Sequence, residues 1–582
     1  MRLVEIRLLE GPNVYRLEPV VKVELGIGRR RSWYGKRIPA RHALVWLGAT
    51  TPAKDWPEGV AAVAAWVRRL RADHGDGAGG GRVHRSSDPG HWIVTWPWTG
   101  AERAQLIAEA AFELAERNLS PLRKADLTPA QTRVLERWTE RISAAGATPP
   151  SWVRDADRQI PIVSISGTNG KSTVTRLITH ILLLAGKHVG TTTSDGVLVD
   201  ERMVDPGDWT GPAGAAQILE RSDIDIAVLE TARGGIVLRG VGYESNDASV
   251  LTNVSSDHLD LQGIHTLPEL AEVKSVINRI TKPSGWAVLN GDDPFVAAVG
   301  RRLRAKLAYF SLDGRAQVVR RHLASGGRAY LLEDGDLVEA EGERRSTIIA
   351  VADVPITIAG LARHNIANAL AAAGAARGLG ATLAQVREGL RDFRPSSERS
   401  PGRLNIFRVA SKVVIVDFAH NEAGIGAVLD VAEGIAAGGA GRTAPITAII
   451  GTAGDRPDDT LRGIGKVAGK RAQRIVIKET RKYLRGRTRE SMVGELLAGV
   501  RAAGRATSDI PVYESETAAL RAELALNGAK AGGSDVGRVI VLMCHEEREE
   551  VFKLLEDLGA RPVDVMSELT KLVPRLQGRP RQ

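Results

Sequence analysis

Short apolar runs alternate with amphipathic stretches along most of the chain after residue 160. The apolar runs have the length and composition of buried strands, and they lie at 162–166, 224–229, 248–253, 287–290, 413–417, 446–451, 474–477 and 539–543. Stretches with helical periodicity separate them, and this alternation predicts α/β domains built on parallel sheets. A polar, proline-flanked segment at 395–401 divides the strands into two groups. We therefore expect a central domain at 160–397 and a smaller Rossmann-like α/β domain at 398–566.

The first 150 residues differ from the rest of the chain in composition and in their pattern of apolar positions. They hold most of the tryptophans, and segments 20–25 and 91–96 alternate like strands, whereas 101–118 has helical periodicity. This pattern predicts an N-terminal α+β domain at 1–145 with its own core. The segment 146–159 contains Ala, Gly and Pro, and we interpret it as a linker. We interpret 567–582 as a basic tail.

Composition narrows the class of protein. A chain of 582 residues is too long for one hydrophobic core, and 43% hydrophobic with 25% charged residues is typical of globular proteins. The single cysteine, Cys544, excludes an internal disulfide framework and a thiolate zinc site. The chain has no apolar run of membrane-spanning length, and charged residues interrupt its apolar start. We expect a cytoplasmic protein with no membrane partner.

The net charge of +10 is mild for this length, but two segments are denser in basic residues. One is 29–41; the other, the second basic cluster, consists of Arg471, Arg474, Lys478, Arg481, Lys482, Arg485, Arg487 and Arg489. Both suit a solvated face or a phosphate-bearing substrate. Because aromatic residues are only 4% of the chain and form no stacking platform within the second basic cluster, nucleic acid is not the expected partner.

The most specific motif joins the apolar strand at 162–166 to a glycine-bracketed turn and a helix. Its residues are Gly167, Thr168, Asn169, Gly170, Lys171, Ser172 and Thr173. Glycines let backbone N–H groups converge on phosphate oxygens, Lys171 supplies a charge for the terminal phosphates, and the Ser172 hydroxyl can ligate Mg²⁺. The strict Walker pattern fails, since Ile165 stands where it requires glycine. The motif predicts a P-loop-type central domain that binds phosphate groups and Mg²⁺.

The sequence of this loop resembles the nucleotide loop of the Mur ligase family, whose members are three-domain, ATP-dependent amide-forming enzymes. Within that family it resembles the cyanophycin synthetase branch. The resemblance continues in the family's order through further short motifs, at 190–196, 210–212, 228–235, 252–253, 257–259, 273–275, 289–294, 364–366 and 417–421. The opening Glu10-Gly-Pro-Asn13 resembles the N-terminal domain of that branch. The branch has an ATP-grasp domain after its N-terminal domain, and here only residues 144–158 occupy that place. We therefore expect the second ATP site of the branch to be absent.

Candidate metal ligands follow strand ends. Glu230 ends the segment 224–229, at the sheet edge where ligands bind in open α/β folds, and its carboxylate suits Mg²⁺. The resemblance implies that Ser172, Glu230 and His258 bind metal, and that Lys274 is a catalytic lysine which family members carbamylate. Taken from spacing alone, His258 reads as a capping or core residue and Lys274 as a solvated helix lysine.

The resemblance also assigns the remaining residues. It implies that Asn290 contacts adenine, that Arg403 reaches ATP across the domain interface, and that Asp417 binds the ribose. It places the substrate among Thr193, Thr210, His364, Asn365, His420, Asn421 and Arg485. The family follows this asparagine with proline, whereas this chain has Glu422.

The resemblance implies a ligase that activates a carboxylate as an acyl phosphate and joins it to the amine of an amino acid. The acid would be an acidic peptide or a small-molecule carboxylate, and the protein could form a homo-oligomer as its relatives do. Three other readings stay open from the sequence: an inert nucleotide-binding scaffold, a ligase of this fold for a cell-wall or folate-type substrate, and a nucleic-acid-dependent ATPase.

Overall fold

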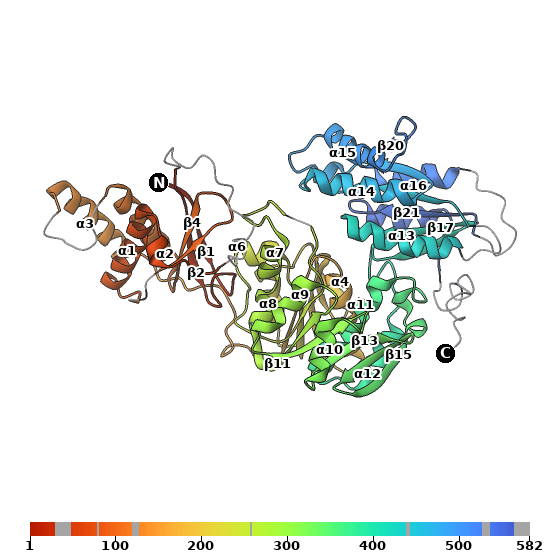
Figure 1. Ribbon diagram of the computed structural model, residues 1–582, viewed down its shortest axis with the longest axis horizontal. Helices are drawn as coiled ribbons and strands as arrows, with labels where there is room; N and C mark the ends of the chain where they lie inside the picture. Colours follow the sequence, from red (N-terminus) through yellow and green to blue (C-terminus); the bar gives the residue numbers. More distant parts are fainter. Residues whose placement is uncertain are drawn as a thin grey trace.

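The computed structural model of the chain arranges three domains in sequence order (Figure 1). It describes residues 1–28, 48–77, 79, 81–118, 127–256, 259–437, 443–526, 536–563 and 568. The first basic segment and the predicted tail lie outside these residues, apart from residue 568 in the tail. Among the helices it describes, none is long and apolar enough to cross a bilayer.

The N-terminal domain is a four-stranded antiparallel sheet, in the order β1-β2-β4-β3, with helices against it. Its elements are β1 (Arg2–Leu9), β2 (Val20–Gly26), α1 (Glu58–Asp73), β3 (Arg82–Arg85), β4 (His91–Pro97), α2 (Ala101–Glu116) and α3 (Pro129–Ala144). The alternating segments 20–25 and 91–96 are β2 and β4, and the helical segment from residue 101 is α2, so these predictions are confirmed. Tryptophans Trp66 and Trp96 are fully buried in this domain's core.

The central domain is built on an 11-stranded sheet in the order β15-β14-β13-β12-β11-β10-β5-β9-β6-β7-β8. Its strands are β5 (Ile162–Ser166), β6 (Val189–Thr192), β7 (Gly196–Val199), β8 (Arg202–Pro206), β9 (Ile226–Glu230), β10 (Asn246–Leu251), β11 (Thr281–Asn290), β12 (Lys306–Ser311), β13 (Arg328–Glu333), β14 (Asp336–Glu341) and β15 (Arg344–Ala350). Its helices are α4 (Lys171–Leu184), α5 (Pro212–Leu219), α6 (Arg233–Leu238), α7 (Leu267–Lys274), α8 (Val276–Arg279), α9 (Pro294–Val299), α10 (Gln317–Ala324), α11 (Arg363–Gly378) and α12 (Leu383–Asp392).

The sheet is mixed, whereas the sequence pattern predicted a parallel one. The strands from β13 across to β6 are parallel, but antiparallel hairpins extend both ends, β14-β15 at one and β7-β8 at the other. These hairpin strands alternate with tight turns rather than helices, so the β–helix–β pattern does not reveal them. The helical stretch around Lys274 is divided in two, since α7 ends at Lys274 and α8 begins at Val276.

The C-terminal domain has a seven-stranded sheet in the order β20-β19-β18-β21-β17-β16-β22. Its strands are β16 (Asn405–Val409), β17 (Lys412–Asp417), β18 (Ile446–Ile450), β19 (Arg474–Lys478), β20 (Val512–Tyr513), β21 (Arg538–Met543) and β22 (Arg561–Pro562). Its helices are α13 (Glu422–Ala437), α14 (Asp458–Arg471), α15 (Arg489–Ala502), α16 (Glu516–Ala525) and α17 (Arg548–Asp557). The strands from β20 to β17 run parallel, and β16 and β22 add an antiparallel edge.

The N-terminal domain meets the central domain through a backbone seam. The Glu10 N–H donates to the Arg239 carbonyl, and the Val241 N–H donates to the Pro12 carbonyl, each at 2.7 Å. A Cβ on Gly11 would lie 1.8 Å from the Val241 carbonyl oxygen, so only glycine fits there. The seam follows directly after α6, which begins three residues beyond the end of β9.

Candidate active site

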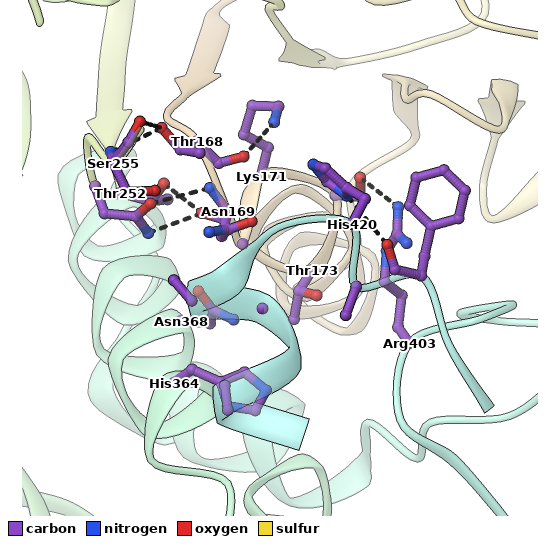
Figure 2. Close-up of a pocket in the computed structure, with 18 of the residues that line it drawn as sticks. Thr168, Asn169, Lys171, Thr173, Thr252, Ser255, His364, Asn368, Arg403 and His420 are labelled. Carbon is purple, nitrogen blue, oxygen red and sulfur yellow. Dashed lines mark hydrogen bonds between the residues drawn. The ribbon is translucent and has the colours of Figure 1, made fainter. Parts of the chain in front are cut away.

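The carboxyl ends of the central strands and of β17 face one cavity of about 710 Å³ (Figure 2). Strands β5, β9, β10 and β11 are parallel, so the segments after them gather at a single sheet edge. The structure brings most of the predicted site residues to the wall of this cavity: Thr168, Asn169, Gly170, Lys171, Ser172, Thr173, Thr210, Glu230, Lys274, Asn290, His364, Asn365, Arg403, Asp417 and His420.

The loop between β5 and α4 has a backbone that favours glycine at two points. Gly167 has φ 146° and Gly170 has φ 87°, both in the region that L side chains rarely adopt. A Cβ on Gly167 would also lie 1.9 Å from Thr252 Oγ1, and one on Gly170 would lie 2.3 Å from Asn368 Oδ1. The loop delivers the chain into α4 at Lys171, so the unpaired N–H groups of that helix face the cavity.

Residues after β10 hold this loop in place. The Thr168 N–H donates to the Asn253 carbonyl at 2.8 Å, and the Asn169 N–H donates to Asn253 Oδ1 at 3.0 Å. The Asn169 carbonyl accepts from Thr252 Oγ1 at 2.6 Å and from Asn253 Nδ2 at 3.0 Å. Thr252 and Asn253 therefore support the loop. The chemistry of their side chains did not predict this role, although the motif at 252–253 was part of the resemblance.

Two lysines donate hydrogen bonds to backbone carbonyl groups of the same loop. The Lys171 ammonium donates to the Thr168 carbonyl at 3.0 Å, and the Lys274 ammonium donates to the Gly167 carbonyl at 2.7 Å. Lys274 ends α7 and is buried, so it is not the solvated helix lysine that spacing alone suggested. Both ammonium groups thus border the cavity.

Glu230 brings a buried carboxylate to the cavity. Its side chain is 3% exposed, and its Oε2 has no hydrogen-bond partner. Burial raises the pKa of Glu230, against the opposing effects of the Lys171 ammonium and a hydrogen bond from Ser172. A buried oxygen without a partner is costly, which is the condition under which a carboxylate takes up a cation.

Contacts across the domain boundary close the far side of the cavity. Asn169 of the loop and Asn421 of the C-terminal domain join their side-chain amides, with Asn421 Nδ2 donating to Asn169 Oδ1 at 3.1 Å. Arg403 donates to Ser172 Oγ at 3.4 Å, and its guanidinium lies over the Phe418 ring at 4.7 Å. The loop therefore touches the segment between the domains and the C-terminal domain itself.

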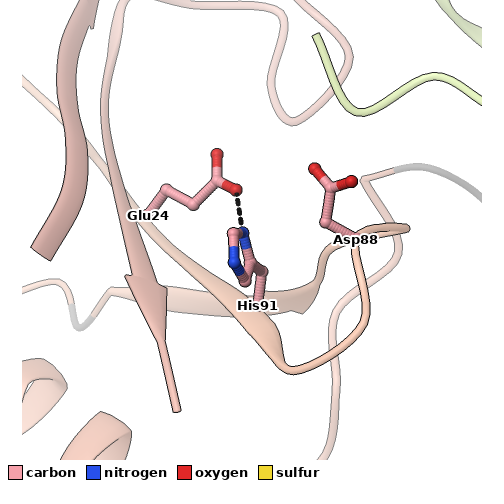
Figure 3. A group of neighbouring side chains, drawn as sticks. All are labelled: Glu24, Asp88 and His91. Carbon is pink, nitrogen blue, oxygen red and sulfur yellow. Dashed lines mark hydrogen bonds and ion pairs between the residues drawn. The ribbon is translucent and has the colours of Figure 1, made fainter. Parts of the chain in front are cut away.

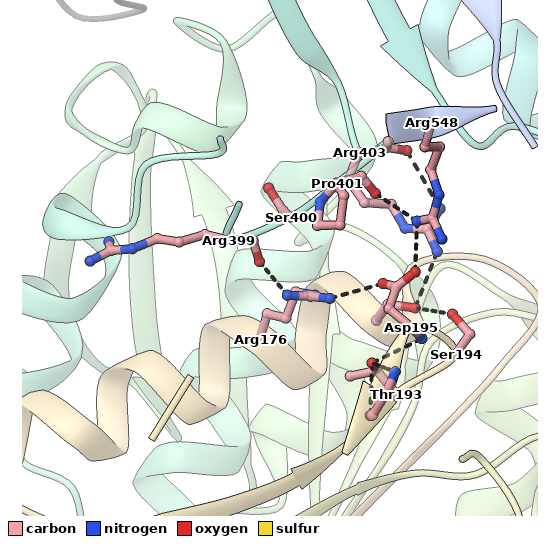
Figure 4. Close-up of polar contacts among 12 residues, drawn as sticks. Arg176, Thr193, Ser194, Asp195, Arg399, Ser400, Pro401, Arg403 and Arg548 are labelled. Carbon is pink, nitrogen blue, oxygen red and sulfur yellow. Dashed lines mark hydrogen bonds and ion pairs between the residues drawn. The ribbon is translucent and has the colours of Figure 1, made fainter. Parts of the chain in front are cut away.

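Behind Arg403 lies a buried carboxylate that sequence reasoning did not single out, Asp195 (Figure 4). It accepts from Arg548 of α17 at 2.7 Å and from Arg176 of α4 at 2.8 Å. Burial alone would raise the pKa of Asp195, but Arg403, Arg548 and Arg176 outweigh it and hold the pKa at about 2. Asp195 is thus ionised at neutral pH and links α4 of the central domain to α17 of the C-terminal domain. Its sequence signal was its place in the motif at 190–196.

The other cavity residues are held by backbone contacts. Asp417 accepts from the N–H groups of Leu404 at 2.9 Å and Ala419 at 2.8 Å, while burial raises its pKa. Asn290 Nδ2 donates to the Thr252 carbonyl at 2.7 Å. Asn365 Nδ2 donates to the Ile356 carbonyl at 2.9 Å. Burial lowers the pKa of His364 to about 4, so this imidazole is neutral at pH 7.

Several predicted residues do not line the cavity. The Thr193 hydroxyl accepts from the N–H of Asp195 at 3.1 Å and of Gly196 at 3.2 Å, so it shapes the turn after β6. Gly167 and Asn421 contact lining residues without bordering the space. His258 lies outside the described residues.

Arg485 forms an ion pair with Asp455, as most residues of the second basic cluster do with an acidic residue. Most members of the second basic cluster have acidic partners: Arg471–Glu433, Arg474–Glu523, Lys478–Glu516, Arg481–Glu514, Arg485–Asp455, Arg487–Asp458 and Arg489–Glu479. This neutralisation removes the main reason in the sequence to expect a polyanionic nucleic acid there.

A second group of metal-ligand types lies far from the cavity, in the N-terminal domain. Glu24, Asp88 and His91 place one ligand atom each within 4.8 Å of one another (Figure 3). Each already has a partner, since Glu24 contacts His91 and the Lys22 ammonium at 2.8 Å each and Asp88 contacts His265 at 2.9 Å. We assign no metal to it.

Comparison with known proteins agrees with this geometry. A model of the Mur ligase middle domain matches residues 165–376. The central domain is therefore similar to the Mur ligase middle domain. The chain is 41% identical over 321 residues to the cyanophycin synthetase of Synechocystis sp., and 38% identical over 346 residues to that of Crocosphaera subtropica. It is 28% identical over 417 residues to the UDP-N-acetylmuramyl-tripeptide synthetase of Deinococcus radiodurans, covering 70% of this chain and 76% of that one.

The likeness to the cyanophycin synthetases is partial in length. The matched part is 55–60% of this chain but only 36–39% of those relatives. Among solved structures, a bifunctional folylpolyglutamate synthase/dihydrofolate synthase with Mn, AMPPNP and L-glutamate bound is similar to 68% of this chain. That match covers 89% of the other chain, with a TM-score of 0.50 and 19% identity, and it shows that the two chains share a fold.

Proposed function

We propose that this protein is an ATP-dependent amide ligase that activates a carboxylate as an acyl phosphate and joins it to the amine of an amino acid. One observation carries the proposal: a single cavity is bordered by a phosphate-type loop, a buried carboxylate with an unpartnered oxygen, and an arginine from the domain junction. The relatives named as synthetases share the matched region.

The nucleotide would bind with its phosphates at the loop 167–173. The N-terminus of α4 offers unpaired N–H groups and a positive dipole end, and Lys171 adds a positive charge. Arg403 would contact the phosphates, Asp417 the ribose and Asn290 the base, as the resemblance implies. Asn290 and Asp417 line the same cavity as Lys171, which makes one nucleotide spanning them sterically reasonable.

The donor set fits a hard divalent cation. Glu230 Oε2 is buried without a partner and Ser172 lies within hydrogen-bonding reach of Glu230, and both oxygens are of the type that Mg²⁺ prefers. The resemblance adds His258 as a third ligand and a carbamylated Lys274 as a bridging group. Bound Mg²⁺ would supply positive charge that offsets the repulsion between triphosphate and carboxylate.

The reaction joins two displacement steps. A substrate carboxylate oxygen attacks the γ-phosphorus of ATP, and ADP leaves with the electron pair of the broken P–O bond. The amine then adds to the acyl carbon, phosphate leaves with the C–O electron pair, and the nitrogen loses a proton. Lys171 and Arg403 would offset the charge that gathers in the first step. The contacts Asn169–Asn421 and Arg403–Ser172 would limit water at the acyl phosphate, which hydrolysis would waste.

The relatives indicate the chemical classes of the two substrates but not the individual compounds. We infer an amino acid as amine donor and an acidic peptide or small carboxylate as acceptor, with Thr210, His364, Asn365 and His420 nearest to them. Homo-oligomerisation and the domain limits 1–145, 160–397 and 398–566 belong to the same proposal.

The test is ADP release from Mg·ATP, measured against a panel of amino acids crossed with acidic peptides, including a muramyl peptide. We expect ADP formation that depends on both an acid and an amine, with a mass spectrum showing the joined product. The Lys171→Met variant is the matched negative control. ADP formation that ignores every acid and amine, or that rises with DNA or RNA instead, would overturn the assignment.

A further inference from the structure

The most buried cation of the C-terminal domain, among the residues described, is Lys478 at the end of β19. Its side chain is fully buried, and its ammonium contacts Glu516 Oε1 at 2.6 Å, His545 Nδ1 at 2.9 Å and Thr480 Oγ1 at 3.4 Å. A buried ammonium with several acceptors is a costly arrangement that persists only when each contact is satisfied. None of these residues touches the cavity, so the proposed chemistry gives Lys478 no role.

The geometry fixes the tautomer of His545. An ammonium can only donate, so Nδ1 of His545 must be the acceptor and carry no proton. The neutral ring then carries its proton on Nε2, which lies 2.8 Å from the Ala419 carbonyl oxygen and donates to it. The lowered pKa of His545, caused by burial and by Lys478, agrees with a neutral ring.

Glu516 anchors the arrangement from the other side. It accepts from Lys478 and from the backbone N–H groups of His545 at 2.6 Å and Glu547 at 2.9 Å. Burial alone would raise the pKa of Glu516, but the Lys478 ammonium and the hydrogen bond from the His545 backbone N–H outweigh it and hold the pKa at about 2. The carboxylate therefore stays ionised, and the ammonium keeps its counter-charge at neutral pH.

The chain of contacts ends at the cavity wall. Ala419 lies in the segment 417–420, every residue of which lines the cavity. The His545 ring lies 5.1 Å from the Phe418 ring, against which Arg403 packs at 4.7 Å. A donor at His545 Nε2 thus fixes the peptide between Asp417 and His420.

We propose that His545 is a positioning residue: held as its Nε2–H tautomer by Lys478, it holds the Ala419 carbonyl and with it the segment 417–420 that faces the nucleotide. The nucleotide part of this inference rests on the proposed function; the tautomer and the hold on Ala419 do not.

Two substitutions separate the two ring nitrogens. His545→Gln keeps a donor near the Nε2 position, whereas His545→Asn keeps an acceptor near Nδ1 for Lys478 but cannot reach Ala419. His322→Gln is the matched control, because that ring also contacts a backbone carbonyl, Leu307 at 3.1 Å, but lies away from the cavity.

Hydrogen exchange and nucleotide affinity are the readouts. In His545→Asn we expect faster exchange in peptides covering 417–421, and a dissociation constant and KM for ATP at least fivefold higher with kcat within twofold. His545→Gln should stay within twofold of the native protein in all of these, and His322→Gln should not change them. Nitrogen-15 spectra of the native protein should show His545 protonated at Nε2, and Lys478→Met should change that signal.

Equal exchange in His545→Asn and the native protein, or an Nδ1–H signal, would overturn the inference. If ATP does not bind at all while exchange and tautomer follow the expectation, the proposed function fails and the hold on Ala419 stands. If ATP binds normally to His545→Asn despite faster exchange, the positioning role is refuted and the ligase proposal is untouched.

Discussion

The carboxylate of Asp195 is expected to contribute more to stability than any surface ion pair of this protein. Its side chain is 7% exposed, and its partners Arg176 and Arg548 are 6% and 26% exposed. The pKa falls from 3.8 to about 2 because three guanidinium groups outweigh the cost of burial. Since one pKa unit corresponds to about 1.4 kcal/mol, this shift represents roughly 2 kcal/mol of net stabilisation of the ionised form.

The sign follows from the direction of the shift. A folded-state pKa below the unfolded value means that the stabilisation is fully present above about pH 4 and is lost as the pH falls toward 2. At pH 7 the full contribution is therefore available to be removed. Asp195→Asn keeps the shape of the side chain and removes the charge, which leaves three buried or half-buried guanidinium groups without it.

Urea denaturation at pH 7, followed by circular dichroism, measures the loss. We expect Asp195→Asn to lower the free energy of unfolding by about 2 kcal/mol or more, and Asp223→Asn to change nothing measurable, because Asp223 pairs with Arg221 at the surface. The double variant Asp195→Asn/Arg548→Met should lose less than the sum of its parts. Native stability in Asp195→Asn, or strict additivity with Arg548→Met, would refute this account of the Asp195 contacts.

Three further substitutions test the cavity. Lys171→Met should abolish ADP release while the thermal midpoint stays within a few degrees, which differential scanning fluorimetry with a turnover assay checks. Glu230→Gln should lower turnover by about 10²-fold or more. Because burial raises the pKa of Glu230, the ionised carboxylate lowers the stability of the folded protein above the ordinary pKa of glutamate. The variant should therefore melt at a higher temperature than the native protein at pH 8, and added MgCl₂ should no longer stabilise it. Gly170→Ala should cost at least about 1 kcal/mol and weaken ATP binding in calorimetric titrations, because φ is 87° and the new Cβ would lie 2.3 Å from Asn368 Oδ1; an alanine variant with native affinity would contradict it.

Features set by local sequence were predictable, and features set by distant contacts were not. The strand at 162–166 and the loop after it could be located because apolar pattern, glycines and Lys171 are contiguous. Asp195 could not be assigned its role, since its partner Arg548 lies 353 residues away and nothing local marks the pair. The hairpin β14-β15 was not predicted either, because no α-helix follows directly after either strand and the strand–helix alternation therefore does not mark it.

The candidate site divides in the same way. Glu230 was predicted at a strand end, and the structure places it there at the cavity. The resemblance set Arg485 among the substrate residues, but the acid that neutralises it, Asp455, comes from another loop and no spacing rule connects the two. The supports Thr252 and Asn253 act through backbone groups of the phosphate loop, so their side-chain chemistry gave no hint of it.

The seam at Gly11 bears on how this protein could be cut into parts. Two main chains approach there with no side chain between them, and the seam lies next to Gly240, where a Cβ would lie 2.6 Å from the Gly11 carbonyl oxygen. A fragment that starts after residue 145 would bare the N–H of Val241 and the carbonyl of Arg239 to water. The tryptophan-rich domain is thus built in as a fixed neighbour of the helix that follows Glu230, and shortened versions should be made with that boundary intact.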